Sequence, residues 1–410
     1  MQDFDKPIPQ AKLDIVDKTR SNLFAWRGQF SPQLIEIILS SYCPSNSVVL
    51  DPFAGSGTVL LEAGFFALEA YGFEINPAAW ILSKTYEFIN DSQRNESLEK
   101  IRTLIDREFL FRIFEGSHQL LDLPQKLNRI RNDLDNPGKN IFDALIILLD
   151  VANNRITNEY IQSKFTDLAT LIEKLPFSEK KIKVGLADAR SIPLANDRVD
   201  FVITSPPYIN VFNYHQNYRR SVEILGWDLL KIAKSEIGSN RANRGNRFYT
   251  VVQYCLDMGD TLRELSRVTK NGGRIVFVVG HESNVLGVPF YNADIIEKIG
   301  TRANIFHKSL RQKREFKNKF GKIIREELIN FVNLKSGCSK EVVEQVAREV
   351  AFDVLRSSLS LVPCKNRQSL EDAIEKAQYI GRTPILDNRS HVYQVSQLVQ
   401  IASSESSQPF

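Results

Sequence analysis

The chain has 410 residues, of which 43% are hydrophobic and 25% are charged. This composition is ordinary for a globular protein, and the length exceeds the needs of one small core, so we expect at least two domains. The formal net charge of +4 permits a nucleic-acid partner without requiring one.

Cysteine spacing and hydropathy exclude several classes of protein. The cysteines lie far apart and form no CxxC pair, so neither a zinc site nor a disulfide framework is predicted. No apolar run reaches the ~20 residues of a membrane span. The first residues, Met1 onward, lack the apolar region of a signal peptide. We therefore expect a cytoplasmic protein.

The N-terminal part predicts an arm followed by a helix. Residues 1–20 are polar and indicate an extended arm. Ser31 and Pro32 suit the N-cap and the first position of a helix, and apolar residues then recur at helical spacing. The aromatic residues just before them, Trp26 and Phe30, either pack in the core or form a wall of a ligand pocket.

A short apolar strand at 48–50 runs directly into the sequence Asp51-Pro52-Phe53-Ala54-Gly55-Ser56-Gly57-Thr58, after which a helix begins. Glycine lets the backbone approach a ligand, and the helix N-terminus directs its amides at it. The next strand, 70–74, ends at Glu74. It lies roughly 20 residues after the glycines, where an acid commonly binds ribose hydroxyls. The phosphate-loop pattern GxxxxGK[ST] is absent, so we expect a nucleoside ligand without phosphates.

Residues 85–180 have a different pattern, with apolar residues at helical spacing and punctuation by proline and glycine. We expect a helical insertion between two strands of one sheet. Acidic and basic residues are balanced in this segment, so no basic stripe facing DNA is predicted. A structural cap is favoured over a role in substrate binding.

The strand pattern resumes at 181–186, and Asp188 then stands at a strand end, where its carboxylate could accept a hydrogen bond from an adenine amino group. The next strand, 199–203, leads into Thr204-Ser205-Pro206-Pro207-Tyr208. The prolines fix the backbone and donate no hydrogen bond. We expect a rigid corner with the Ser205 hydroxyl and the Pro206 carbonyl facing outward at a ligand-binding edge of the sheet.

The rest of the chain predicts nucleic-acid contacts and a helical tail. A helix is expected to end at a glycine cap, 271–273, before a strand at 274–280 and a final edge strand at 327–332. Arginines among aromatic residues, and a basic segment at 302–325, suit phosphate contact and base stacking. The candidate substrate-binding residues are Tyr214, Arg219, Arg244, Arg247, Arg311 and Arg314. Residues 401–410 are expected to be disordered.

The glycine-turn sequence, 51–58, and the corner, 204–208, together resemble the S-adenosylmethionine-dependent amino-methyltransferases of DNA, which make N4-methylcytosine or N6-methyladenine. The resemblance covers roughly 24–80 and 181–332. It implies an α/β fold of the Rossmann-like methyltransferase type, with a mostly parallel twisted sheet. The implied division is a core at 1–84 and 181–335, the helical insertion at 85–180, and a helical tail at 336–410 that is a candidate for target recognition.

The resemblance also implies S-adenosylmethionine as cofactor, no metal, double-stranded DNA as partner, and a restriction-modification system with a companion endonuclease. It leaves the oligomeric state open. The implied cofactor-binding residues are Phe30, Pro32, Asp51, Phe53, Gly55, Gly57, Thr58, Glu74 and Asp188. The implied catalytic residues are Ser205, Pro206, Pro207 and Tyr208.

The residues of the corner suit methylation of an amine. An exocyclic amine is a poor nucleophile because its lone pair is delocalised into the ring of the base. The Ser205 hydroxyl and the Pro206 carbonyl would accept hydrogen bonds from its two N–H groups and orient the lone pair. The base must be flipped out of the duplex, and Tyr208 could return about 1–3 kcal/mol by stacking. Serine at the first motif position favours cytosine N4 over adenine N6.

Three alternatives are weighed against this interpretation. An RNA guanine-N2 methyltransferase would look similar around 51–63, but usually has an RNA-binding module before the glycine turn, where about 50 residues stand here. A ring-carbon methyltransferase needs a nucleophilic cysteine beside a proline, and Pro363-Cys364 lies in the tail. A binding protein with an inactive methyltransferase fold is disfavoured by the intact corner at 205–208.

Overall fold

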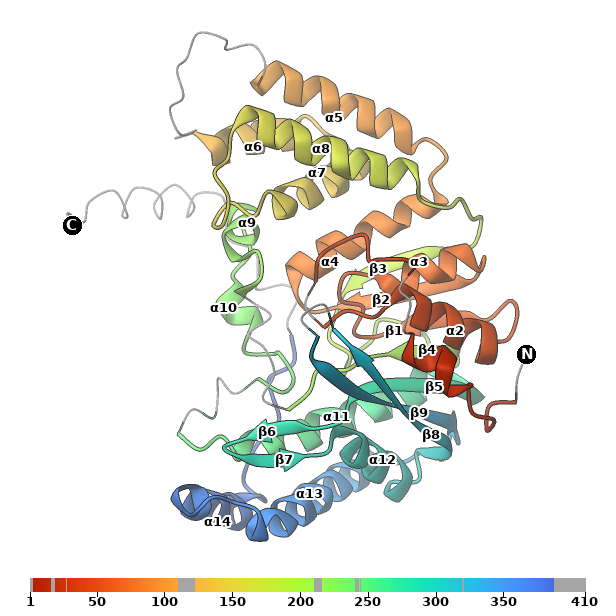
Figure 1. The fold of residues 1–410 in the computed structure, drawn as a ribbon, viewed down its shortest axis with the longest axis vertical. Coiled ribbons are helices and arrows are strands. Elements are labelled where there is room, and N and C mark those ends of the chain that lie inside the picture. Colours follow the sequence, from red (N-terminus) through yellow and green to blue (C-terminus); the bar gives the residue numbers. More distant parts are fainter. Residues whose placement is uncertain are drawn as a thin grey trace, which may run out of the picture.

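A seven-stranded sheet forms the centre of the molecule, with helices on both faces (Figure 1). The computed structural model describes residues 3–15, 19–26, 28–109, 122–209, 216–239, 243, 245–318 and 321–386. The strands of the sheet are β1 (Val48–Asp51), β2 (Glu69–Glu74), β3 (Ile182–Leu186), β4 (Val199–Thr204), β5 (Thr269–Gly280), β8 (Phe306–Lys317) and β9 (Ile323–Asn333). A separate hairpin pairs β6 (Ser283–Val285) with β7 (Val288–Phe290).

The strand order is β3-β2-β1-β4-β5-β9-β8. The first five strands are parallel to their neighbours, whereas β9 is antiparallel to both β5 and β8. The expected mostly parallel, Rossmann-like sheet is therefore confirmed. The chain builds outward from β1 through β2 to β3 and then returns to β4 on the other side of β1. The carboxyl ends of β1 and β4 thus form the switch point, where ligands bind in open α/β sheets.

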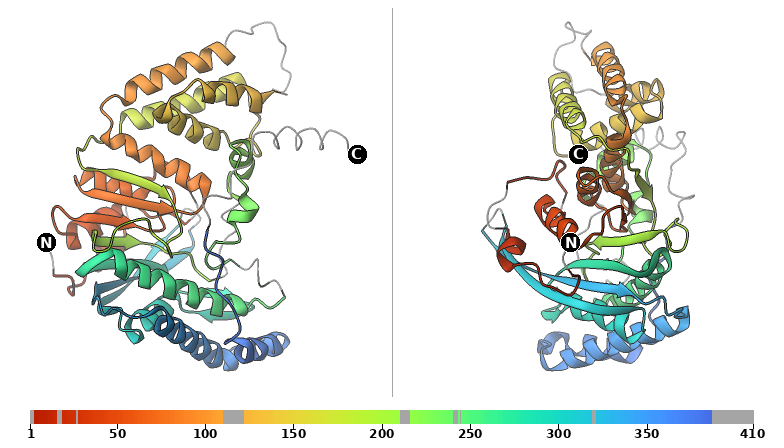
Figure 2. Two further views of the ribbon diagram at one scale, coloured as in Figure 1. Left: turned by 180° about the vertical axis from the view of Figure 1, so that it is seen from behind. Right: turned by 90° about the vertical axis from the view of Figure 1, so that its right-hand side faces the viewer.

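Each face of the sheet is covered by its own helices and apolar core (Figure 2). Residues of one strand alternate between the faces, so Val49 packs into one core while Val48 and Leu50 pack into the other. The helices on the first face are α2 (Pro32–Tyr42), α3 (Thr58–Phe65) and α4 (Pro77–Lys84). Those on the second face are α11 (Tyr249–Val268), α12 (Asn292–Arg302) and α13 (Lys340–Ser357).

Between β2 and β3 the chain forms a helical lobe at one end of the molecule (Figure 1). Its helices are α5 (Arg94–Phe109), α6 (Leu123–Asn132), α7 (Asn136–Leu149) and α8 (Asn158–Glu173), which follow the 3-10 helix η1 (Thr85–Asn90). Helix α7 packs on α4, and the apolar core of the lobe is continuous with that of the first sheet face. The lobe is therefore built onto the sheet by shared apolar packing.

The opposite end of the molecule is formed by α13 and α14 (Arg367–Lys376), which are joined by η3 (Ser358–Ser360) and η4 (Cys364–Asn366). Helix α13 packs on α11, and α14 packs on α13. The short helices α9 (Arg219–Ile224) and α10 (Leu229–Ile232) connect β4 to α11. Target recognition by this helical tail stays a prediction, and the segment expected to be disordered, 401–410, lies outside the described residues. Within the described ranges, every helix is too short or too polar to cross a membrane.

Three expectations about individual elements are corrected. Residues 3–15 are not an extended arm: they include α1 (Gln10–Asp14), which contacts α2 and β8, and the side chains of Phe4, Ile8, Leu13 and Ile15 are buried. Asn271, Gly272 and Gly273 do not cap α11, which ends at Val268; they lie where the register between β4 and β5 shifts. Finally, β9 is an internal strand, because β8 pairs outside it and takes the edge.

Candidate functional site

The glycine turn after β1 is held by the carboxylate of Glu74. Glu74 Oε2 accepts a hydrogen bond from the Gly55 amide at 2.8 Å, and Oε1 accepts from the amides of Ile75 (2.9 Å) and Asn76 (2.8 Å). Each carboxylate oxygen has about two lone pairs, so Oε2 keeps one for a ligand. Burial raises the pKa of Glu74 above its ordinary value, and the backbone donors oppose that rise.

Gly57 allows α3 to begin against α4 and η1. Its φ is +89°, and a Cβ atom built there would lie 2.6 Å from the ring of Tyr86. Left-handed backbone and close approach both require glycine at this position. The turn is thus fixed from behind by Tyr86 and from the β2 side by Glu74.

Asp51 links the glycine turn to the corner that follows β4. Its Oδ1 accepts a hydrogen bond from the Thr204 hydroxyl at 2.6 Å and from the Phe53 amide at 3.1 Å. The side chain is buried, and burial raises the pKa of Asp51 from 3.8 to about 7. The ends of β1 and β4 therefore keep a constant relative position through a single buried carboxyl group.

We predict that Asp51→Asn removes a pH-dependent loss of stability. Because the folded-state pKa is raised, the protonated carboxyl stabilises the fold fully below pH 3.8, and this contribution is lost as pH rises to about 7. Between about pH 5 and pH 8 the wild type should lose roughly 2–3 kcal/mol through this group, and the variant should not. Chemical unfolding across this range measures the difference. The exposed Asp5→Asn is the control, and parallel curves for Asp51→Asn and wild type would contradict the prediction.

The carboxyl ends of β1, β2, β3 and β4 surround a cavity, here called the first cavity. It is lined by Trp26, Gly28, Gln29, Phe30, residues 52–56, Thr58, residues 74–76, residues 187–189, Ser205, Pro207 and residues 235–237. The segment before α2 folds over the glycine turn, because the Ser56 hydroxyl donates to Gln29 Oε1 (2.9 Å) and the Thr58 hydroxyl donates to Asn22 Oδ1 (3.0 Å).

A second cavity adjoins the first. It is lined by Asn22, Ala25, Trp26, residues 28–31, Asp150, Asn153, Ser205, residues 216–218, Arg314, Phe316, Asn318 and Glu326. Residues from the segment before α2, together with Ser205, line both cavities. The helical lobe contributes Asp150 and Asn153, which follow α7, and the β8–β9 hairpin contributes Arg314, Phe316, Asn318 and Glu326.

The corner 205–208 lies at the junction of the two cavities. Ser205 lines both of them, and Pro207 lines the first. Ser205 Oγ lies 3.4 Å from the Tyr208 hydroxyl. The Tyr208 ring packs on Gly280, where a Cβ atom would lie 2.9 Å from it. Pro206 is buried, so a catalytic role for its carbonyl stays a prediction.

Most residues expected to bind a cofactor converge on the first cavity: Phe30, Phe53, Gly55, Thr58, Glu74 and Asp188. Asp51 and Gly57 instead support the turn, as described above. Pro32 does not share this location. It occupies the first turn of α2 and lines an apolar groove with Leu61 and Phe65 on the side of α8.

The expected role of Asp188 needs a correction. Its Oδ1 accepts hydrogen bonds from the amide (3.0 Å) and Nε (2.9 Å) of Arg190. Its Oδ2 accepts from Arg190 Nη2 (2.7 Å) and from the Leu386 amide (3.2 Å). These four donors fill the lone pairs of the carboxylate. Asp188 therefore forms part of the cavity wall without a free oxygen for an adenine amino group.

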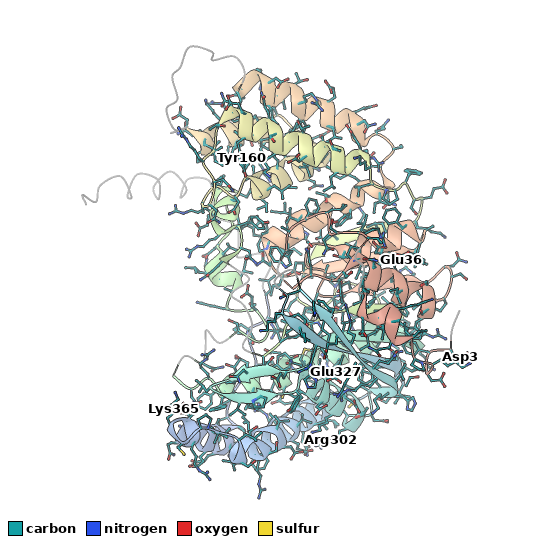
Figure 3. All side chains as sticks on the ribbon, in the orientation of Figure 1. Asp3, Glu36, Tyr160, Arg302, Glu327 and Lys365 are labelled. Carbon is teal, nitrogen blue, oxygen red and sulfur yellow. The ribbon has the colours of Figure 1, made fainter. Side chains whose placement is uncertain are left out.

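The basic residues expected to contact DNA differ in their locations and in their ion-pair partners. Arg311 lies within an acidic cluster, pairing with Asp294 (2.7 Å), Glu297 (3.1 Å) and Glu327 (2.6 Å), so it is not a free phosphate ligand. Figure 3 labels Glu327 on the β8–β9 hairpin. Arg314, three residues along β8, points to the other face, as strand alternation requires, and lines the second cavity.

The remaining candidates lie elsewhere. Arg219 is exposed at the start of α9, and its Nε donates to Glu223 Oε1 at 2.6 Å. Arg247 precedes α11. Tyr214 and Arg244 lie outside the described residues. DNA contact by these four residues stays a prediction.

The structure adds residues that the sequence did not single out. Residues 235–237 line the first cavity although they follow α10, far along the chain from the glycine turn. Trp26, by contrast, was expected to pack in the core or to form a wall of a ligand pocket, and it lines both cavities with its ring stacked on Tyr218, the centroids lying 6.4 Å apart and the planes inclined by 19°. The local sequence pattern was enough to indicate Trp26 and the proline-rich corner as candidate site residues. The sequence around residues 235–237 gave no such indication, because only the fold brings these residues to the first cavity.

The first cavity has the chemistry to hold the nucleoside end of S-adenosylmethionine. Glu74 keeps a lone pair for a ribose hydroxyl, as described above. Asn76 Nδ2 is buried in the same wall and has no hydrogen-bond partner among the described residues, so it could donate to a ligand. Phe30 and Phe53 supply flat apolar surfaces. Among the described residues, no basic side chain lines this cavity, which suits a nucleoside without phosphates.

Comparisons with known proteins agree with this chemistry. Residues 11–84 match the N6/N4 family described as DNA methylase. Over 137 residues, 30% of this chain and 26% of its relative, the sequence is 25% identical to the type II methyltransferase M.MjaII of Methanocaldococcus jannaschii. Over 135 residues, 33% of this chain and 27% of its relative, it is 30% identical to the type II methyltransferase M.MvaI of Kocuria varians. The chain thus spans about a quarter of the length of each curated relative.

Among solved structures, a SAM-dependent methyltransferase of Methanosarcina mazei matches 72% of this chain and 97% of its own, at 11% identity and a TM-score of 0.36. The family match covers α2, the glycine turn and Glu74. The resemblance to the N6/N4 amino-methyltransferases of DNA is confirmed, as a distant homology to type II methyltransferases.

Proposed function

We propose that this chain transfers the methyl group of S-adenosylmethionine to the exocyclic amine of a base flipped out of double-stranded DNA. The observation that carries this proposal is the position of Ser205, which lines both cavities. The first cavity is built on the glycine turn, and the second cavity adjoins it and shares Ser205 with it. A donor held in one and a base held in the other would meet at Ser205.

The corner supplies hydrogen-bond acceptors for the amine. The Ser205 hydroxyl and the Pro206 carbonyl would accept from the two N–H groups and turn the nitrogen lone pair toward the first cavity. When bound, S-adenosylmethionine supplies an electrophilic methyl group on its sulfonium. The amine nitrogen would gain this methyl group as the bond from the methyl carbon to the sulfonium sulfur breaks, leaving S-adenosylhomocysteine as an uncharged thioether, and the nitrogen would release one proton to solvent. The Asp51–Thr204 hydrogen bond fixes the corner relative to the glycine turn, so the two reactants are aligned before reaction.

Planar side chains in the second cavity support a base as its ligand. The Arg314 guanidinium lies 4.4 Å from the centroid of the Phe316 ring, and both residues line this cavity. Tyr218 lines the same cavity and stacks on Trp26. Aromatic and guanidinium planes stack on bases with little preference for sequence. The helical lobe would then form one wall of the base site through Asp150 and Asn153.

We favour cytosine N4 as the acceptor, because Ser205 is the first residue of the catalytic motif Ser-Pro-Pro-Tyr at 205–208. The two curated relatives are type II methyltransferases by name. We therefore propose that the chain is the modification enzyme of a restriction-modification system and acts beside a companion endonuclease.

Product analysis tests the proposed function. The protein is incubated with methyl-labelled S-adenosylmethionine and unmodified genomic DNA, which contains every short recognition sequence, or with tRNA. The nucleic acid is then digested and the labelled nucleoside identified by mass. We expect N4-methylcytosine from DNA and no label in tRNA.

The alternatives predict other products. N6-methyladenine would retain the amino-methyltransferase but contradict the choice of base, and label in tRNA as N2-methylguanine would contradict the DNA substrate. Binding of S-adenosylmethionine without transfer to either nucleic acid would indicate a binding protein with an inactive methyltransferase fold.

A further inference from the structure

A buried ion-pair network joins the C-terminal segment of the chain to the wall of the first cavity. Arg190 lies at its centre, with Asp188 beside β3 and Asp257 on α11, and all three side chains are at most 3% exposed. Arg190 Nη2 lies 2.7 Å from Asp188 Oδ2, and Nη1 lies 2.7 Å from Asp257 Oδ1. Buried charges are stable only when they are paired and hydrogen-bonded, so each member depends on the others.

Residues that follow α14 complete this network. The carbonyls of Thr383 and Pro384 accept hydrogen bonds from Arg190 at 2.7 and 2.9 Å. With the two aspartates, they occupy all five N–H donors of the guanidinium. The Thr383 amide (3.0 Å) and hydroxyl donate to Asp257, and the Leu386 amide donates to Asp188 at 3.2 Å.

The same network touches two segments that line the first cavity. Asp188 belongs to the lining segment 187–189, and Arg190 Nη2 also approaches the carbonyl of Ser235, in the lining segment 235–237, at 3.5 Å. Arg190 itself is fully buried behind these segments. It can therefore affect a ligand through the placement of the wall and not through contact.

We propose that Arg190 and the segment 383–386 are positioning elements of the methyl-donor site, an inference that rests on the proposed function. The C-terminal segment fills the donors of Arg190, and Arg190 in turn fixes the lining segments 187–189 and 235–237. The segment 383–386 thereby sets the affinity for the adenosyl ligand. The network contacts the wall of the first cavity directly and reaches the corner at 204–208 through the neighbouring Gly238, so we expect a larger effect on donor binding than on methyl transfer.

Two variants and a matched control test this role. Arg190→Lys keeps the positive charge but loses the planar fork, whereas Thr383→Val keeps the shape of the side chain and removes the hydroxyl bound to Asp257. Arg267→Lys is the control, because Arg267 also binds a carboxylate, that of Glu264, and two carbonyls, those of Ile192 and Leu194, but it is partly exposed and lies at the far end of α11.

Calorimetric titration with S-adenosylhomocysteine, which does not react, gives the Kd of each variant, and kinetics separate kcat from KM. We expect Arg190→Lys to raise the Kd and the KM for the donor about 10-fold or more by displacing the wall, with kcat at saturating donor largely retained. Thr383→Val should shift the Kd in the same direction by a smaller factor, and Arg267→Lys should affect thermal stability alone. If Arg190→Lys does not fold, Thr383→Val carries the test.

Two outcomes would overturn the inference, and they differ from each other. If the wild type binds the ligand and neither Arg190→Lys nor Thr383→Val changes the Kd, the network is only structural and the proposed function stands. If the wild type binds no adenosyl ligand, the proposed function fails with it.

Discussion

Gly238→Ala is expected to lower methyl transfer about 100-fold, since a displacement of about 1 Å between reacting groups has an effect of that size. Gly238 follows the cavity-lining segment 235–237 and has a φ of +76°. A Cβ atom there would lie 2.2 Å from the carbonyl oxygen of Tyr208 and 3.2 Å from its carbonyl carbon. Both are backbone atoms, so the clash cannot be relieved by rotating a side chain.

The displacement would reach the site whichever segment moves. To bring the 2.2 Å contact to at least 3.0 Å, either Tyr208 or residues near Gly238 must shift. The first shift moves the corner, and the second moves Ile237 in the wall of the first cavity. We therefore expect a loss of kcat, a rise in the donor Kd, or both. The added strain and overpacking should also cost about 2–4 kcal/mol in the free energy of unfolding.

Gly272→Ala is the matched control. Gly272 also has a left-handed backbone, with a φ of +70°, but nothing lies within 4 Å of the Cβ atom built there. It should lose only the ~1–2 kcal/mol of the left-handed conformation and keep its activity. Gly280→Ala should be intermediate, because its Cβ would meet the ring edge of Tyr208 at 2.9 Å and not backbone. Equal kcat and equal donor Kd for the Gly238 and Gly272 variants would contradict the rigid contact.

The parts of the site that the sequence predicted share one property: their signals are local. An apolar strand that runs into glycines predicts a ligand-binding turn. An acidic residue at the end of the next strand predicts a ligand-binding carboxylate beside that turn. The turn at 52–57 and Glu74 meet in the structure because parallel strands end at the same edge of the sheet. The corner at 204–208 joins them because β4 pairs with β1, as the fold class implies.

The parts that escaped prediction depend on contacts between distant segments. Nothing in the sequence near Thr383 indicates that it meets Asp257, and nothing near Gly238 indicates that it lies on the Tyr208 carbonyl. The error with Arg311 has the same cause. Its charge is visible in the sequence, but the carboxylates that neutralise it come from α12 and β9. A charge run thus predicts a nucleic-acid surface only after its partners are known.

Ser205→Ala provides the sharpest test of the proposed chemistry. The Ser205 hydroxyl lies at the junction of the two cavities and 3.4 Å from the Tyr208 hydroxyl. Loss of one preorganised hydrogen-bonding group at a reacting centre typically lowers kcat about 100-fold or more. The variant removes a single oxygen atom and leaves the glycine turn and Glu74 intact. The Kd for S-adenosylmethionine should therefore stay within about twofold of the wild type, because the lost interaction is made to the amine.

Tyr208→Phe distinguishes the contribution of the Ser205 hydroxyl to kcat from that of the neighbouring Tyr208 hydroxyl. It keeps the ring that packs on Gly280 and removes the hydroxyl near Ser205. The loss of one neutral hydrogen bond should lower kcat by about 2- to 10-fold, well short of the effect of Ser205→Ala. Single-turnover rates and calorimetric Kd values for both variants give the comparison. If Ser205→Ala weakened donor binding as much as it slowed transfer, Ser205 would belong to the donor site, and the acceptor for the amine would have to be sought elsewhere in the corner.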